Sequence, residues 1–80
     1  MSLVNLTEMI VKSLIKDPDS VSIKEFDNED ELVIEVIVSE EDMPSIIGKD
    51  GKLINSIRTL VQASSYIKDN KKVRINISSI

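Results

Sequence analysis

Cysteine, histidine and tryptophan are all missing from this 80-residue sequence, which holds only two glycines, two prolines, one tyrosine and one phenylalanine. Without cysteine a disulfide framework is excluded, and without cysteine or histidine the usual zinc and copper ligand sets cannot be assembled. Neither a charged leader with an apolar core nor a run long enough to cross a bilayer is present. We therefore expect a soluble, cytoplasmic protein with no metal, no cofactor and no contact with a membrane.

The same absences leave few groups for catalysis. An enzyme would need a base or nucleophile with an orienting partner, and only serine, lysine and carboxylates remain for those roles. The acidic cluster at residues 27–31 lacks the spacing and the glycine of a calcium-binding loop, so we interpret it as a solvated hairpin turn. The sequence predicts a protein that is not an enzyme.

Charge is unevenly distributed along the chain. The net charge is -4, but residues 1–44 hold three lysines against twelve carboxylates, or -9, whereas residues 45–80 hold seven basic residues against two carboxylates, or +5. Affinity for phosphate comes largely from lysine and arginine, so the basic half indicates an anionic partner that the average conceals. The alternative is an ordinary mixed surface whose charges happen to be sorted along the chain.

Hydrophobic periodicity divides the first half into a helix and two strands. Apolar residues recur at helical spacing over residues 2–16, and Asp17 followed by Pro18 ends that helix. Residues 21–27 fit a strand whose alternation slips before Phe26, which predicts a bulge near Glu25. The strand after the acidic turn has apolar residues on both faces, so it should lie inside the sheet. Its main apolar face is formed by Leu32, Ile34, Val36 and Val38.

The second half is expected to contain two helices and one strand. A short helical turn ending at Gly48 precedes a long helix over residues 52–68, and residues 72–78 alternate as a half-buried strand. A chain of this length buries only about 60% of its unfolded surface, which allows one thin core. The order αββααβ therefore predicts a single α+β domain over residues 1–80, with a three-stranded sheet covered on one face by three helices. The candidate caps of the short turn are Ser39, Glu41 and Asp42.

The loop Gly48, Lys49, Asp50 and Gly51 joins the two helices. Two glycines three residues apart allow a short turn with backbone angles that glycine adopts at low cost, and they let another backbone approach. The amides that open the following helix at Lys52 carry partial positive charge and suit a phosphate. An isolated match of this kind is more often a hinge or a helix cap. Here it lies between two apolar helices, where the basic half of the chain starts.

In this context the loop resembles that of the KH module, in which such a loop clamps about four nucleotides of RNA. The element order is similar to the type II, prokaryotic arrangement. Over nearly its whole length the chain resembles the small stand-alone bacterial KH proteins of the KhpA (YlqC) family. The residues that carry the resemblance are those at 43–52, followed by Ile54, Ile57, Arg58, Leu60 and Val61.

The resemblance implies a protein that binds single-stranded RNA. It also implies a homodimer, or a pairing with a larger Jag-like (KhpB) KH protein, in the control of cell elongation and division. Asp50 departs from the family pattern, because many KH loops hold a neutral or basic residue there, and we expect it to weaken binding. The expected RNA-binding residues are Ile46, Ile47, Gly48, Lys49, Asp50, Gly51, Lys52, Ile54 and Arg58.

The apolar and aromatic residues leave several alternatives open. Ile46, Ile47 and Ile54 are expected to form an aliphatic floor under the bases, together with Val36 or Val38 of the second strand, and plain core is the alternative for each. The lone aromatic residues lie far from the loop in the chain and do not predict a stacking platform. The alternative function is a protein-interaction scaffold that keeps the KH fold and makes little contact with RNA. A dimer contact is predicted at Leu60, Val61, Tyr66 and Ile67.

Overall fold

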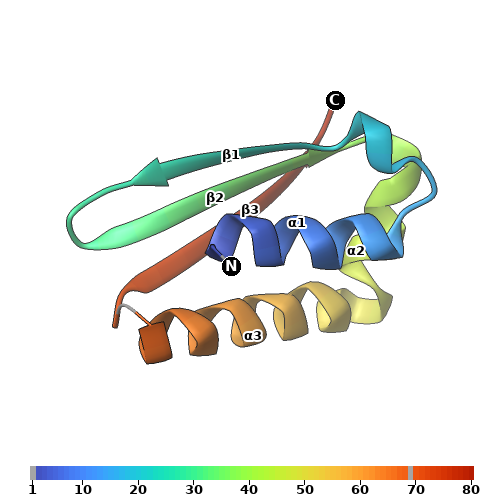
Figure 1. The fold of residues 1–80 in the computed structure, drawn as a ribbon. Helices are drawn as coiled ribbons and strands as arrows, with labels where there is room; N and C mark the ends of the chain where they lie inside the picture. Colours follow the sequence, from blue (N-terminus) through green and yellow to red (C-terminus); the bar gives the residue numbers. More distant parts are fainter. Residues whose placement is uncertain (1, 69) are drawn as a thin grey trace.

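The computed structural model describes residues 2–68 and 70–80, in which one three-stranded sheet packs against helices (Figure 1). The helices lie together on one side of the sheet. Their order along the chain confirms the predicted α+β arrangement. The elements are α1 (Leu3–Leu14), β1 (Ser22–Asp27), β2 (Glu31–Val38), α2 (Met43–Ile47), α3 (Lys52–Lys68) and β3 (Lys72–Ser79), with 3-10 turns at Pro18–Ser20, Glu40–Asp42 and Lys49–Gly51.

Strand β2 is the centre of the sheet, as predicted. It pairs antiparallel with β1 and parallel with β3. Its residues alternate between buried and half-buried positions along the whole strand, because successive side chains point to opposite faces and the helices cover only one of them. Ile34, Val36 and Val38 are fully buried, and Val11 of α1 and Val61 of α3 belong to the same core.

Strand β1 contains no bulge, so the prediction of one near Glu25 was wrong. The residues of β1 pair one for one with those of β2 along the whole strand. Ile23 lies opposite the buried Val36 and shares its face, whereas Phe26 lies opposite Val33 on the other face and is 49% exposed. The apparent slip in the hydrophobic pattern therefore reflects an aromatic residue on the open face of the sheet, with no extra residue inserted.

Helix α1 packs beside α3 beneath the sheet (Figure 1). Ser2 caps the helix, and its Oγ accepts a hydrogen bond from the Asn5 N–H at 3.0 Å. The helix ends at Leu14, earlier than the predicted residue 16, because Ile15 already has an extended backbone with φ -109° and ψ 161°. Across the described residues, no helix has both the length and the apolar character needed to span a bilayer.

Asp42 occupies the cap position of α2 but makes no capping hydrogen bond. Its buried carboxylate instead accepts hydrogen bonds from the Lys16 N–H at 3.1 Å, the Asp17 N–H at 3.3 Å and the Ser39 Oγ at 3.1 Å. The Lys16 amide is the main cause that lowers the pKa of the Asp42 carboxyl below its usual range. Of the three candidate caps, Asp42 thus has the expected position, but its side chain ties the α1–β1 connection to the start of α2.

Candidate nucleic-acid interface

Gly48 forms the turn at which α2 ends. Its backbone has φ 73° and ψ -176°, a combination that is open to glycine and rarely adopted by other residues. A Cβ atom at this position would lie 2.6 Å from the Cβ of Leu53, so a side chain is also excluded by contact. The Gly48 N–H donates to the Pro44 carbonyl at 3.0 Å, which closes the last turn of α2. The tight turn expected at this glycine is present.

Two further loop residues have positive φ. Asp50 has φ 57° and ψ 27°, and Gly51 has φ 74°. Aspartate tolerates this left-handed region better than most residues. The Gly51 N–H donates to the Gly48 carbonyl at 3.5 Å, and a Cβ on Gly51 would meet nothing closer than the Asn55 Nδ2 at 3.9 Å. The loop therefore closes as a single short turn, with open space beside its second glycine.

The loop is open to solvent where α3 begins. Lys49, Asp50 and Lys52 are exposed, and Gly48 and Gly51 are half-buried. The first amides of a helix have no acceptor within that helix, and the aligned peptide dipoles place partial positive charge there. The Gly51 and Lys52 N–H groups already donate to the Gly48 and Lys49 carbonyls within the loop. The junction thus offers an anionic ligand the positive end of the α3 dipole and two lysine side chains, beside one opposing carboxylate.

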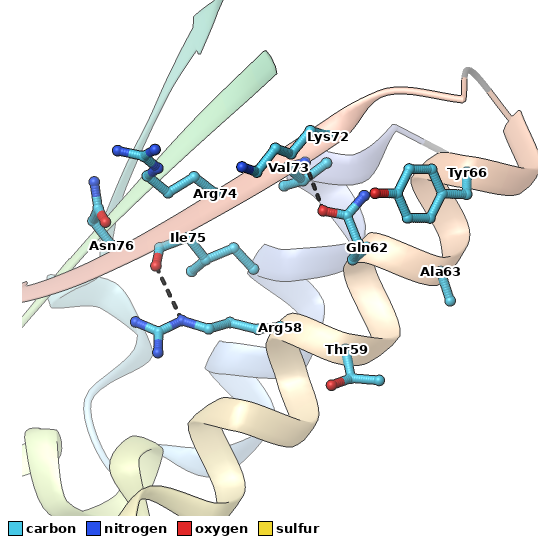
Figure 2. Close-up of a pocket in the computed structure, with 10 residues that line it drawn as sticks. All are labelled: Arg58, Thr59, Gln62, Ala63, Tyr66, Lys72, Val73, Arg74, Ile75 and Asn76. Carbon is cyan, nitrogen blue, oxygen red and sulfur yellow. Dashed lines mark hydrogen bonds between the residues drawn. The ribbon is translucent and has the colours of Figure 1, made fainter. Parts of the chain in front are cut away.

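Arg58 connects the solvent edge of α3 to β3. Its Nε donates to the Ile75 carbonyl at 3.2 Å (Figure 2), and its Nη1 donates to the Asn55 Oδ1 at 3.5 Å. A guanidinium has five N–H donors, so most of them stay available on this exposed side chain. Asn55 in turn lies beside Gly51. The loop, Asn55 and Arg58 therefore form a continuous polar track along α3.

This track leads into a groove of about 640 Å³ between α3 and β3, which we call the α3–β3 groove. None of its lining residues is acidic, although 14 of the 80 residues of the chain are aspartate or glutamate. The groove is therefore a basic surface on an acidic protein. Its lining, drawn in Figure 2, consists of Arg58, Thr59, Gln62, Ala63, Tyr66, Lys72, Val73, Arg74, Ile75 and Asn76.

Of the groove residues, sequence reasoning expected only Arg58 to bind RNA, and it assigned Tyr66 to a dimer contact. Gln62 joins the two walls, since its Oε1 accepts from the Val73 N–H at 2.9 Å and its Nε2 donates to the Lys71 carbonyl at 3.0 Å. The alternation of β3 did place Lys72 and Arg74 on one face of a strand. Nothing in the sequence, however, indicates that this strand lies beside the polar edge of α3.

The expected aliphatic residues have different positions. Ile46 is fully buried and Ile54 is 6% exposed, so neither side chain is open to a ligand in this structure. Val36 and Val38 are likewise fully buried. For these residues the core alternative describes the structure, because all four belong to the buried hydrophobic core. Ile47 is half-buried and is the member of the expected floor that keeps some contact with solvent.

The residues predicted for a dimer contact do not share one surface. Val61 is fully buried in the core, so that part of the prediction was wrong. Tyr66 lines the α3–β3 groove, whereas Leu60 and Ile67 are 53% and 85% exposed. A helix turns through about 100° per residue, so residues 60 and 67 share one face. Residues 61 and 66 lie on other faces of the helix. Leu60 and Ile67 form the exposed apolar part of α3.

Comparisons with known proteins agree with this geometry. Residues 4–77 match the family model described as KhpA/KhpB, KH domain. A protein of Clostridium perfringens named RNA-binding protein KhpA is 44% identical over 90% of this chain and 95% of its own length. A protein of the same name from Thermotoga maritima is 39% identical over 90% of this chain and 93% of its own length.

The fold is also similar to part of a solved structure, that of Era in complex with MgGDPNP and nucleotides 1506–1542 of 16S ribosomal RNA. The TM-score is 0.67 and the identity 23% over 96% of this chain, which spans only 29% of that Era chain. The proteins of Clostridium perfringens and Thermotoga maritima are named RNA-binding proteins, and the matched family is one of KH domains and not an enzyme family, in agreement with the interpretation of this chain as a non-enzyme. The chain belongs to the KhpA/KhpB family of KH domains.

Proposed function

We propose that this chain binds single-stranded RNA through the loop at residues 48–51 and the α3–β3 groove. The observation that carries the proposal is the double-glycine turn at the start of α3, whose Lys49 and Asp50 are exposed and from which a polar track leads into a groove without acidic residues. KH loops of this kind clamp about four nucleotides. The name shared by the relatives, RNA-binding protein KhpA, supports the same class of partner.

In this proposal the loop holds the sugar-phosphate backbone. Gly51, which has open space beside it, lets the strand approach, the positive end of the α3 dipole attracts its phosphates, and Lys49 and Lys52 add positive charge. The remaining N–H groups of Arg58 bind the next part of the strand. The buried isoleucines beneath the loop keep these groups in place, and RNA binding through them is therefore indirect.

A titration of labelled single-stranded RNA at several salt concentrations tests this function. With two to four phosphates neutralised, the logarithm of the association constant should fall against the logarithm of salt with a slope of about -1.5 to -3. Lys49→Glu should weaken binding about fivefold or more and make the slope shallower. Lys12→Glu is the matched control, because Lys12 is an exposed lysine of α1 outside the loop and groove. Equal effects of the two variants would favour the protein-interaction scaffold instead.

We further propose that two KH domains act together, either as a homodimer or with a larger Jag-like (KhpB) KH protein. A single site of about four nucleotides binds weakly, and pairing two sites raises the effective concentration at the second. The exposed Leu60 and Ile67 on α3 support an apolar contact on that face. The proposal includes a cytoplasmic location, where cellular RNA is found. It also includes a role in cell elongation and division.

Sedimentation at micromolar concentration tests the pairing. We expect the parent chain to sediment as a dimer and Ile67→Asp to sediment as a monomer. Ile80→Asp places the same new charge on an 83%-exposed isoleucine at the other end of β3 and should leave the dimer intact. A parent chain that is monomeric both alone and when mixed with the larger KH protein would contradict the proposal.

A further inference from the structure

Tyr66 lies in the last part of α3, at the end of the α3–β3 groove remote from the loop. Figure 2 shows its ring beside Gln62, on the groove side of the helix. The side chain is 53% exposed, so much of the ring is in contact with water. A half-exposed aromatic ring in a groove has a free surface on which a flat apolar group can stack. This ring makes no contribution to the loop itself.

The walls around this ring suit a nucleic acid strand in charge. Arg58, Lys72 and Arg74 line the groove, and no lining residue carries a negative charge. Glu31, which is not a lining residue, forms an ion pair with Arg74 at 3.6 Å. This ion pair partly neutralises one of the three positive charges. Val73 and Ile75, which alternate with Lys72 and Arg74 along β3, contribute apolar atoms to the lining. Positive charge for phosphates next to an exposed ring for bases is the combination found in proteins that bind single strands.

The backbone next to Tyr66 is held firmly. Gln62 makes two hydrogen bonds to the backbone of Lys71 and Val73, and the Ser65 Oγ donates to the Lys71 carbonyl at 2.6 Å. Gln62 and Ser65, which lie near Tyr66 in the last turns of α3, therefore hold the start of β3 against the helix. A ring placed by a rigid backbone loses little freedom when a base stacks on it.

The distance along α3 determines which nucleotide reaches this ring. Tyr66 is 14 residues beyond Lys52, which corresponds to roughly 21 Å at about 1.5 Å per helical residue. At about 3.4 Å per stacked nucleotide this distance is roughly six nucleotides, compared with about four held by a KH loop. A strand that follows the groove thus reaches Tyr66 only after it has left the four positions at the loop.

We propose that Tyr66 is a stacking platform for a nucleobase that lies beyond the nucleotides held by the loop. The inference rests on the proposed RNA binding and extends its path to the far end of the groove. It gives the chain a site longer than the loop alone, in which an aromatic ring adds affinity for longer strands without selecting a particular base.

Fluorescence tests this directly, because the chain has one tyrosine and no tryptophan and its intrinsic emission therefore reports Tyr66 alone. We would titrate the protein with oligouridines of about four and about eight nucleotides, following protein emission and, separately, the anisotropy of end-labelled RNA. Stacking should quench the tyrosine on binding of the longer strand and leave it unchanged with the shorter one. Anisotropy provides the affinity in each case.

Two variants separate stacking from a structural role. Tyr66→Phe keeps an aromatic ring and should bind the longer strand within about twofold of the parent, whereas Tyr66→Ala should lose about tenfold, or ~1.4 kcal/mol. Neither variant should alter affinity for the shorter strand. Circular dichroism and thermal unfolding check that both variants fold, as the exposure of this side chain leads us to expect.

Binding of the longer strand without quenching, or an equal loss for both strands in Tyr66→Ala, would overturn the stacking site and leave RNA binding at the loop intact. Quenching by the longer strand that is undiminished in Lys49→Glu, although anisotropy shows weaker RNA binding by that variant, would also overturn it, since the ring would then report something other than bound RNA. No anisotropy change with any strand would contradict the proposed function, and the stacking site with it.

Discussion

Two residues of the loop, Gly48 and Asp50, have opposite consequences for an anionic ligand. Gly48 has backbone angles and a contact with Leu53 that together exclude a side chain, so it keeps the turn short and bare. Asp50 adopts left-handed angles in the same turn and presents an exposed carboxylate. The backbone geometry of the loop therefore favours phosphate, while one of its side chains opposes it.

Replacement of Asp50 tests this opposition. Asp50→Asn removes the charge and keeps a residue that accepts left-handed angles, so the turn should be unchanged. An opposing charge about 4 Å away in water contributes about 1 kcal/mol, so we expect RNA affinity to rise by up to about fivefold. Fluorescence anisotropy at low and high salt measures this. A weaker complex with the asparagine variant would mean that the carboxylate has a positive role in the loop.

Single residues differ in how far their sequence predicts their position. The glycines were predictable, because a double-glycine turn between helices has few other solutions. The isoleucines were not, because an apolar residue at helical spacing fits a ligand floor and a core equally well. The structure places Ile46, Ile54 and Val61 in the core. One face of the thin sheet is shielded from water only if all three side chains pack against it.

At the scale of elements, the contact between α3 and β3 depends on side chains that bind a strand edge. β3 is an edge strand, so one side of its backbone has no partner strand. Gln62 and Arg58 bind the Val73 N–H and the Ile75 carbonyl, respectively. These bonds join two elements, and the sequence reveals neither, because they depend on how β3 lies relative to α3 in the folded chain.

Removal of Gln62 should loosen this contact. Gln62→Ala leaves the Val73 N–H without its acceptor, and we expect a loss of about 1–2 kcal/mol in the free energy of unfolding, or roughly 4–16 °C in Tm. Thr59→Ala is the control on the same helix, since the Thr59 hydroxyl bonds only within α3. Thermal unfolding followed by circular dichroism compares them. Similar Tm values for both variants would show that the hydrogen bonds of Gln62 to the edge strand do not stabilise the fold.

Asp42 joins three segments and should make stability depend on pH. Its pKa in the folded protein is lowered from the ordinary value of 3.8, chiefly by the Lys16 amide, so the ionised form stabilises the fold. This contribution is present above that ordinary value and is lost as the pH falls through the lower pKa of the folded state. Asp42→Asn should therefore have a lower Tm than the parent near neutral pH, with a difference that shrinks in strong acid. Thermal unfolding over this pH range checks it, and a constant difference would contradict the assignment.

At the scale of the whole molecule, charge that is sorted along the chain is also sorted in space. The acidic hairpin turn lies at one end of the sheet, where Lys71 pairs with Asp27 and Arg74 with Glu31. The loop and the α3–β3 groove hold Lys49, Lys52, Arg58 and Lys72, and the groove lining contains no acidic residue. A net charge of -4 is thus compatible with a local basic surface.

The overall fold was predictable because the αββααβ order and the apolar pattern of β2 allow few arrangements. Local order of this kind needs only periodicity and turn residues. The surfaces were less predictable, because an exposed apolar residue and a buried one look alike in a sequence. Leu60 and Val61 are adjacent in the chain, yet one is 53% exposed and the other fully buried.

The central claim is that RNA lies along the loop and the α3–β3 groove, and mapping backbone amide chemical shifts during an RNA titration tests it most directly. We expect the largest changes at Gly48, Gly51 and Lys52, with further changes along α3 to Arg58 and in β3 at Lys72. Strand β1 and the acidic turn should change little. Large shifts on β1 or on the open face of the sheet, with the loop amides unmoved, would contradict the account.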